Sequence, residues 1–256
     1  MLVSEVMLQQ TQVARVLDPW RRFLDAFPSP SACADAPLAS TLRLWAGLGY
    51  HRRAKALHEA ARTIRDEHGG EVPRDATTLR GLPGVGEYTA NAVASFAFGQ
   101  RVAVLDTNVG RVLARAVANR TLRTREARDL AERLLPARGV ASHNQALLDL
   151  GAQYCRAAPR CASCPLACAC RWNLEGGDDP APLSAAVSRR QSMFEGSDRQ
   201  VRGRILGLLR SEEASMATVV AYVAPVERTR VERLVTDLVK DGLVERAGRR
   251  LRLAAS

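Results

Sequence analysis

Lysine is nearly absent from this chain of 256 residues, which contains only Lys55 and Lys240 although its formal net charge is +10. Almost all of the positive charge is therefore arginine. An excess of basic side chains favours a polyanionic partner, because phosphate neutralisation supplies most non-specific affinity for nucleic acids. A basic surface without a ligand is the alternative, and the charge alone does not decide between the two. The scarcity of lysine also restricts any chemistry that requires an amine nucleophile.

Long apolar segments are absent as well, since no run approaches the roughly 20 residues that a membrane span requires. Residues 1–10 have neither the basic start nor the small-residue cleavage site of a signal peptide. We therefore expect a cytoplasmic protein that does not contact a membrane. Disulfides are then a poor explanation for its cysteines.

The first 174 residues lack the alternating pattern of strands. Their apolar residues recur at three- and four-residue spacing, which predicts an all-α fold. Val6, Val13, Val16 and Leu17 fall on one face of a first helix. Further helices are expected over residues 20–27, 38–45, 53–68, 87–97 and 108–117.

Residues 175–184 combine Gly, Asp and Pro, which predicts a linker, here extended over 175–197. Three further helices are expected over 198–209, 215–224 and 227–240, and Gly242 ends the last of them. A hairpin should follow, with its turn near Ala247 and Gly248. Residues 198–256 therefore predict a small winged-helix-like unit, and DNA contact and a purely packing role are equal alternatives for it.

Four cysteines, Cys155, Cys161, Cys164 and Cys170, stand within 16 residues, and Cys168 lies inside the last interval. Clustered thiols in a cytosolic protein indicate a metal site. Zinc sites usually combine two separated CxxC pairs, whereas one CxxC flanked by single cysteines suits a loop around a [4Fe–4S] cluster. We favour the cluster over zinc, with Cys168 as an alternative ligand. The isolated Cys33 is expected to be a buried small hydrophobe.

A short glycine-containing segment, Leu82-Pro83-Gly84-Val85-Gly86, lies between two helical stretches. Two glycines around an apolar residue permit a tight turn and a close approach to a partner. The helix that follows presents its unpaired N–H groups, which suit a phosphate. Followed by Glu-Tyr-Thr-Ala at 87–90, the segment predicts a helix–hairpin–helix that grips the DNA backbone without reading sequence.

With this hairpin and the cysteine loop in one chain, the sequence resembles the endonuclease III superfamily. Within it, the chain resembles the MutY family of glycosylases, which remove adenine opposite 8-oxoguanine or guanine. The matching segments are SEVMLQQTQV (4–13), WAGLGYHRRAKAL (45–57), LPGVGEYTANAV (82–93), VLDTNVGRVLAR (104–115), NQALLDLGAQYC (144–155) and CASCPL (161–166). The resemblance covers residues 2 to about 172. Residues 194–210 resemble the short C-terminal region of actinobacterial members.

This resemblance implies a six-helix lobe over 1–118 and a cluster lobe over 119–174, with a DNA-binding cleft between them. It also implies a monomer in the bacterial cytoplasm, associated with the nucleoid, whose substrate is double-stranded DNA containing A:8-oxoG or A:G mispairs. The family has a further segment before its first shared helix. We therefore expect about 30 more upstream residues in the gene, because a first helix at Met1 begins without a cap.

Glycosidic cleavage needs an acid for the leaving base and an anion for the oxocarbenium-like sugar. By resemblance, Glu5 protonates adenine at N7 and helps to activate water, while Asp106 stabilises the sugar cation. We expect burial to raise the pKa of Glu5 and a helix dipole to keep Asp106 ionised. A solvated Glu and an ordinary N-cap Asp are the alternatives.

Several further positions match the family's DNA-contacting residues. Gln9, Gln10 and Thr11 match the segment that enters the duplex, Tyr50 with Leu48 matches a wedge against the opposing base, and Asn108 matches a residue of the catalytic pocket. Gly84 and Gly86 belong to the backbone-binding hairpin. A solvated polar stripe and a core aromatic are the corresponding alternatives.

The residue at position 88 separates the subfamilies. Bifunctional relatives carry a lysine there, which forms a Schiff base with the sugar and leads to strand cleavage. Tyr88 therefore predicts a monofunctional enzyme. Two other functions remain open: a glycosylase of the same superfamily for T/G mismatches or another base, and a catalytically impaired DNA-binding remnant.

Overall fold

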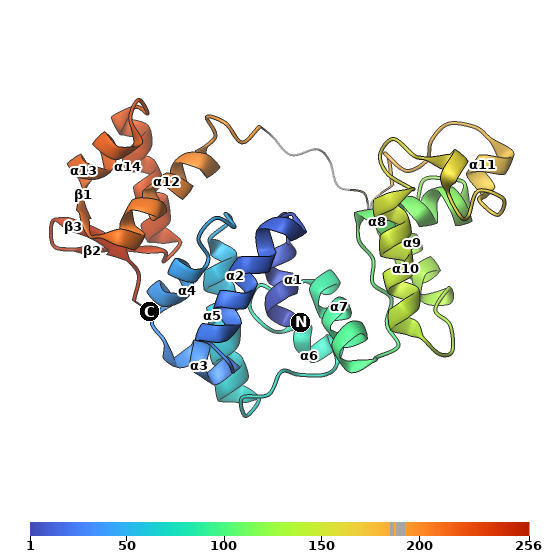
Figure 1. Cartoon of the computed structure of the whole chain (residues 1–256), viewed down its shortest axis with the longest axis horizontal. Helices are drawn as coiled ribbons and strands as arrows, with labels where there is room; N and C mark the ends of the chain where they lie inside the picture. Colours follow the sequence, from blue (N-terminus) through green and yellow to red (C-terminus); the bar gives the residue numbers. More distant parts are fainter. Residues whose placement is uncertain (185–186, 188–192, 256) are drawn as a thin grey trace. The chain divides into compact units, whose positions relative to one another are not determined.

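The computed structural model describes residues 1–184, 187 and 193–255, so part of the expected linker at 175–197 lies outside the described residues. The described chain divides into two units by its internal contacts. We call them the cysteine unit, which contains α6 to α11, and the terminal unit, which contains α1 to α5, α12 to α14 and a small sheet (Figure 1). The expected helical fold is confirmed, and every strand of the described residues lies after residue 213. None of the described helices is long and apolar enough to cross a membrane.

The first half of the terminal unit is built around its longest helix, α5. Its helices are α1 (Leu2–Leu8), α2 (Val13–Ala26), α3 (Pro30–Asp35), α4 (Leu38–Leu44) and α5 (Arg52–Glu67). Helix α3 begins with Ser29 as N-cap, whose side chain accepts a hydrogen bond from Ala32 N, and Pro30 fits the first helical position. Helices α1, α3 and α4 pack on α5 around the buried side chains of Leu42, Trp45 and Ile64.

The single first helix expected through Leu17 is wrong, because the chain leaves the helix after Leu8 and resumes it at Val13. Val13 is 62% exposed and Leu17 is 46% exposed, so neither belongs to the core. The cause of the break is Arg53, whose guanidinium donates to the carbonyl oxygens of Val6 at 2.8 Å and Met7 at 3.0 Å. These carbonyls at the end of α1 are therefore satisfied without a continuing helix.

The second half of the terminal unit has the expected winged-helix-like arrangement. It contains α12 (Asp198–Ser211), β1 (Ala214–Ser215), α13 (Met216–Val223), α14 (Arg228–Lys240), β2 (Val244–Ala247) and β3 (Arg250–Leu253). The strands form an antiparallel sheet in the order β1-β3-β2, with Ala214 opposite Leu251 and Val244 opposite Leu253. In β3 the buried Leu251 and Leu253 alternate with two exposed arginines, as expected for a sheet with one apolar face.

The cysteine unit consists of short helices and one irregular loop. Its elements are α6 (Ala76–Arg80), α7 (Glu87–Phe98), α8 (Thr107–Val112), the π-helix η1 (Leu113–Ala118), α9 (Thr124–Arg133), α10 (Val140–Gln153), the 3-10 helix η2 (Cys161–Ser163) and α11 (Arg171–Glu175). Its core contains Val109, Leu113, Leu122 and Val140. Gly151 lets α10 approach α8, because a Cβ there would lie only 2.5 Å from Asn108 O.

The first residues of the expected linker are packed rather than free. Ala181 is buried in the core of the cysteine unit, and Ser184 Oγ accepts a hydrogen bond from Leu122 N at 3.1 Å. Asp179 forms a two-pronged ion pair with Arg115 at 2.6 and 2.8 Å. Composition alone suggested a linker here because Gly and Pro mark irregular backbone, which can also be anchored.

Candidate active site and cysteine loop

Asp106 stands at the end of an extended segment that buried side chains hold in place. The Asn144 side chain donates to Val102 O at 2.9 Å and accepts from Val104 N at 3.3 Å. Asn91 Nδ2 donates to Ala103 O, and Glu132 accepts from Ala103 N, both within 2.9 Å. Asn144 is 1% exposed, so the segment that leads to Asp106 is fixed from the protein interior.

The Asp106 carboxylate is the N-cap of α8. It accepts hydrogen bonds from Val109 N and from Asn108 Nδ2, each at 2.8 Å. Burial nevertheless raises the pKa of Asp106, although these bonds and the nearby Arg111 act to lower it. The N-terminal N–H groups of α8 favour the ionised Asp106 that we expect from the sequence, whereas loss of water acts against it.

Glu5 lies on α1 in the terminal unit and is only 9% exposed. A solvated surface glutamate is therefore excluded for this position. Val6 and Met7, its neighbours along the chain, are also buried. Glu5 and Asp106 belong to different units, and each is held by its own surroundings.

Arg53 organises the residues that match the DNA-entering segment and the wedge. Besides the end of α1, its guanidinium donates to Thr11 Oγ1 at 3.1 Å and to Leu48 O at 3.2 Å. The segment after α1 and the loop before α5 are thus joined through one side chain. Arg53 was not predicted as a functional residue, because its only signal in the sequence is a position inside the matched segment 45–57.

Two residues of this region have unusual backbone conformations. Gln10 has φ +58° and Tyr50 has φ +47°, in the left-handed region that non-glycine residues seldom adopt. Such strain persists only where surrounding contacts enforce it, and it concentrates at functional sites. Tyr50 is 37% exposed whereas Leu48 is buried, so the tyrosine is the accessible member of the expected wedge.

The expected helix–hairpin–helix consists of α6, the turn at 81–86 and α7. Gly84 has φ +73°, and a Cβ there would lie 2.6 Å from Ala56 Cβ, so glycine is required for two reasons. Gly86 is the N-cap of α7, with φ −82°, and a Cβ there would have no neighbour within 4 Å. Tyr88 lies in the first turn of α7 and lines a cavity of about 360 Å³ with Leu105.

A chain of hydrogen bonds links the catalytic candidates of the cysteine unit to the cysteine loop. Asn108 donates to Asp106 and accepts from Arg111 Nη2 at 2.6 Å. Arg111 in turn donates to Gly151 O at 2.9 Å and to Cys155 O at 2.6 Å. Arg111 was not singled out in the sequence, because an arginine in a helix gives no local sign of such contacts.

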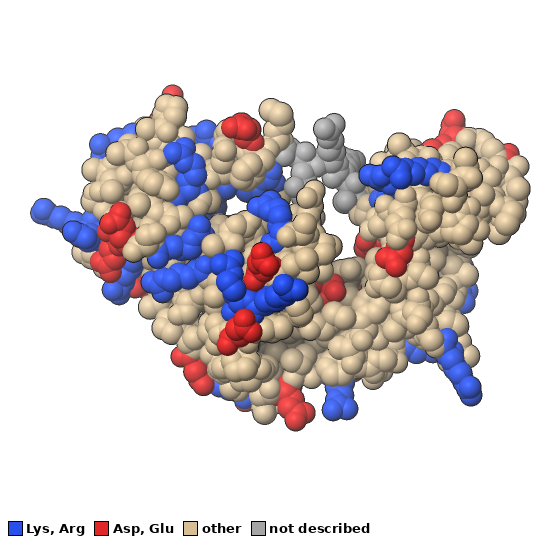
Figure 2. All heavy atoms as spheres, viewed as in Figure 1, with Lys and Arg blue, Asp and Glu red and all other residues tan. Residues whose placement is uncertain are grey.

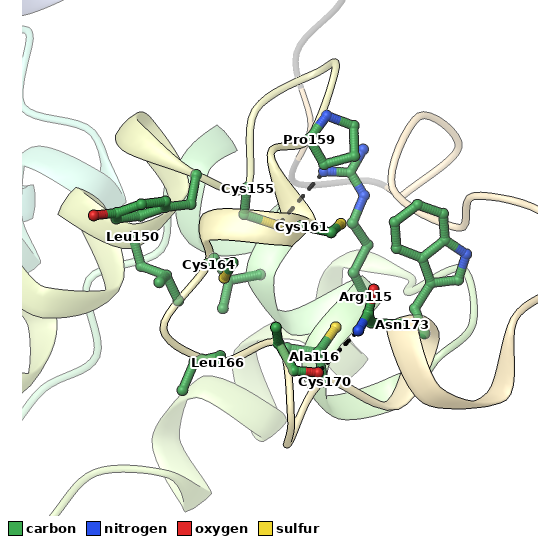
Figure 3. A pocket seen from close by; sticks show the side chains of 14 residues that line it. Arg115, Ala116, Leu150, Cys155, Pro159, Cys161, Cys164, Leu166, Cys170 and Asn173 are labelled. Atoms are coloured by element: carbon green, nitrogen blue, oxygen red, sulfur yellow. Dashed lines mark hydrogen bonds between the residues drawn. The ribbon is translucent and has the colours of Figure 1, made fainter.

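The four cysteines expected to hold a cluster line a single cavity (Figure 3). They are Cys155, Cys161, Cys164 and Cys170, whereas Cys168 is exposed and does not line it. Among the described residues, no three His, Cys, Asp or Glu side chains form a group that could hold a metal ion. The donor set nonetheless suits a cluster, since four thiols on one small apolar cavity are what an iron–sulfur centre uses.

Arg115 is a charged side chain that lines this cavity. The π-helix η1 carries it, and its Nη1 lies 3.5 Å from Cys155 Sγ. Its guanidinium also lies 5.3 Å from the centre of the Trp172 ring, beside Cys170. Arg115 is 1% exposed, so its ion pair with Asp179 is what makes its burial tolerable.

Basic side chains gather over the terminal unit on the face that Figure 2 shows. A hairpin built for close backbone approach, buried carboxylates and a four-cysteine loop define the class of helix–hairpin–helix DNA glycosylases. Residues 3–137 match the family described as the HhH-GPD superfamily base excision DNA repair protein.

Two mycobacterial adenine DNA glycosylases are similar over nearly the whole chain. The protein of Mycolicibacterium smegmatis is 45% identical over 95% of this chain and 83% of its own length. That of Mycobacterium tuberculosis is 47% identical over 96% and 81%. The human adenine DNA glycosylase is 45% identical over 66% of this chain and 32% of its own length.

Solved structures agree with the fold. A thermostable thymine-DNA glycosylase has a TM-score of 0.63 at 28% identity, and a trapped endonuclease III–DNA covalent intermediate has 0.61 at 29%. Each comparison covers 68% of this chain and 83% of the other. The chain belongs to the HhH-GPD superfamily of base excision repair proteins and, within it, to the family of adenine DNA glycosylases.

Proposed function

We propose that this protein acts as a monomer on double-stranded DNA and removes adenine paired with 8-oxoguanine or guanine, without cutting the strand. The observation that carries the proposal is the environment of Asp106, a carboxylate with a raised pKa, held by Val109 N and Asn108 at the matched position. A carboxylate placed in this way can stabilise positive charge that develops on the sugar. The mycobacterial relatives, which are adenine DNA glycosylases by name, support the base.

In this proposal Glu5 supplies the proton. Its burial on α1 suits a carboxylic acid that protonates adenine at N7 and afterwards activates water. Asp106 stabilises the sugar cation that develops as the base leaves. Asn108 keeps the Asp106 carboxylate oriented through their hydrogen bond of 2.8 Å.

We expect no strand cleavage because of where the two lysines of the chain lie. A Schiff base requires an amine, and Tyr88 offers a phenol instead. Lys55 Nζ lies 3.1 Å from Asp241 O in the terminal unit, and Lys240 lies in the last turn of α14. Neither lysine stands at the position of the Schiff-base lysine of bifunctional relatives, which is Tyr88 here.

We further propose a [4Fe–4S] cluster on Cys155, Cys161, Cys164 and Cys170. When bound, such a cluster cross-links the loop through four iron–thiolate bonds. Arg115 would then hold the protein around it by its contacts with Cys155 and Asp179. The exposed Cys168 is left outside this set.

The test is base release under single-turnover conditions from duplexes containing A:8-oxoG, A:G, T:G or thymine glycol. We expect release of adenine from the first two, and an intact abasic strand that breaks only in alkali. Borohydride should trap no covalent adduct. Efficient trapping or preferred release of thymine would overturn the proposal.

Matched variants separate the carboxylates from general damage. Glu5→Gln should abolish release while it retains binding to mismatched DNA, whereas the exposed Glu67→Gln should behave as the parent protein. If Glu5→Gln lost binding as strongly as activity, Glu5 would be a structural carboxylate. Adenine release by a protein without iron would refute any need for the proposed cluster in catalysis.

A further inference from the structure

The winged-helix-like half of the terminal unit is docked on helices α4 and α5 by polar contacts. Asp241, at the end of α14, pairs with Arg52 of α5 at 2.5 Å and with Arg202 of α12. Lys55 Nζ donates to Asp241 O at 3.1 Å, and Leu38 N donates to Ala255 O at 3.1 Å. The Asp241 side chain is 8% exposed, whereas that of Arg52 is 73% exposed, so the carboxylate is buried at the edge of these contacts. They hold α12 beside the loop that carries Tyr50.

Helix α12 extends Arg199 onto Tyr50. Arg199 Nη1 donates to the Tyr50 hydroxyl at 2.5 Å, and its guanidinium lies 5.4 Å from the centre of the tyrosine ring. The same guanidinium lies 5.2 Å from the centre of the Phe194 ring. Arg53 lies over Tyr50 at 5.4 Å as well. Two cationic groups from distant parts of the sequence therefore contact one exposed aromatic ring.

A cavity of about 490 Å³ opens beside this ring. Gln9, Gln10, Tyr50, Arg199 and Arg202 contribute to its lining. Its volume lies in the range of ligand sites, which are usually a few hundred to about 1,000 Å³, and it can accept one base. Asp198, which also lines it, pairs with Arg230 and Arg233 at 2.7 Å, so its charge is already neutralised.

We infer that Arg199 is a positioning residue that holds Tyr50 for stacking on the purine opposite the extruded adenine, so that the C-terminal half tunes discrimination of that purine. The inference rests on the proposed function. The left-handed backbone of Tyr50 requires outside contacts to maintain it, and Arg199 supplies a hydrogen bond and a cation–π contact. A base left without its partner exposes a face that an aromatic ring can cover.

The test measures binding of duplexes in which a non-hydrolysable 2′-fluoro adenosine stands opposite 8-oxoguanine or guanine. Arg199→Ala should reduce the preference between the two by about three- to tenfold, as expected for loss of one hydrogen bond and one cation–π contact. Arg199→Lys should restore it only partly, because lysine keeps the charge without the planar fork. Arg228→Ala removes an exposed arginine of the same half that pairs with Glu232, and it should leave the preference unchanged.

A second measurement distinguishes positioning from other roles. In a Tyr50→Ala background, Arg199→Ala should cause no further loss of preference, because the two side chains act together. An equal loss of affinity for both duplexes would make Arg199 a phosphate contact and overturn the inference, as would an unchanged preference. If the parent protein released no adenine but Arg199→Ala still lowered the preference, the proposed function would fail and the positioning role would stand.

Discussion

Two glycines of the hairpin, only two residues apart, should affect different properties when substituted, Gly84 the stability of the fold and Gly86 the affinity for DNA. Gly84 has a left-handed backbone and no room for a Cβ, whereas Gly86 has an ordinary backbone, open surroundings and the N-cap position of α7. We propose asparagine at each position as the perturbation. Asparagine is among the best N-cap residues and is larger than glycine.

The magnitudes follow from this geometry. At Gly84, φ +73° costs an L-residue roughly 1–2 kcal/mol, and displacement of Ala56, 2.6 Å from the new Cβ, adds about 1–3 kcal/mol. Asparagine tolerates the left-handed region better than most residues, so the lower end applies to the first contribution. Gly84→Asn should therefore destabilise the fold by about 2–4 kcal/mol. Gly86→Asn should leave stability within about 0.5 kcal/mol, because its side chain can cap α7.

DNA binding gives the decisive comparison. If the hairpin backbone meets phosphates, Gly86→Asn should weaken binding to matched and mismatched duplexes alike, by about tenfold, while the urea midpoint stays unchanged. Fluorescence anisotropy at fixed salt measures the DNA affinity, and urea denaturation measures the stability of the fold. Full DNA affinity of Gly86→Asn would refute backbone approach at this turn, and a stable Gly84→Asn would refute the steric argument.

The other predictions concern Asp106, His51 and the cysteines. Asp106→Asn should slow adenine release by about a hundredfold or more. The melting temperature at pH 7 should not fall, because burial raises the pKa of Asp106 and asparagine can still cap α8. A lower melting temperature would contradict the desolvation argument. Burial, with Arg210 and other arginines nearby, lowers the pKa of His51 from 6.5 to about 4, so the folded protein binds fewer protons than the unfolded chain between these values. Stability should therefore fall as the pH drops through this window, by about 2 kcal/mol at pH 5, and His51→Gln should flatten that slope in urea titrations. Cys161→Ser should lose iron by elemental analysis, whereas Cys168→Ser should keep about four atoms per chain, and equal loss in both would reassign the ligands.

Several features of the fold could be predicted because they depend on local sequence. The apolar spacing identified the main helices, and alternation in Arg250–Leu253 with Gly248 before it identified the C-terminal hairpin. The break after Leu8 could not be predicted in this way. No glycine or proline marks it, and the side chain that binds the carbonyls at the end of α1, Arg53, is more than 40 residues away.

The electrostatic environment of the site residues also could not be predicted from the sequence. Asp106 has the sequence signature of an N-cap, and its capping bonds are present. Its pKa nevertheless moves upward, because burial depends on packing by distant segments. Arg111 and Asn144 were missed for the same reason, since their hydrogen bonds reach residues about 40 positions away.

The sequence by itself determined the helical class, the cysteine spacing, the glycine hairpin and the exchange of an amine for Tyr88, because each is a matter of residue type and short spacing. Only the tertiary structure decided which side chains lie close enough to interact. It joined Gln9, Tyr50 and Arg199 around one cavity, and it linked Asp106 to the cysteine loop through Asn108 and Arg111. Hydrogen bonds and desolvation act over a few ångströms, and the folded chain alone sets which groups come within that range.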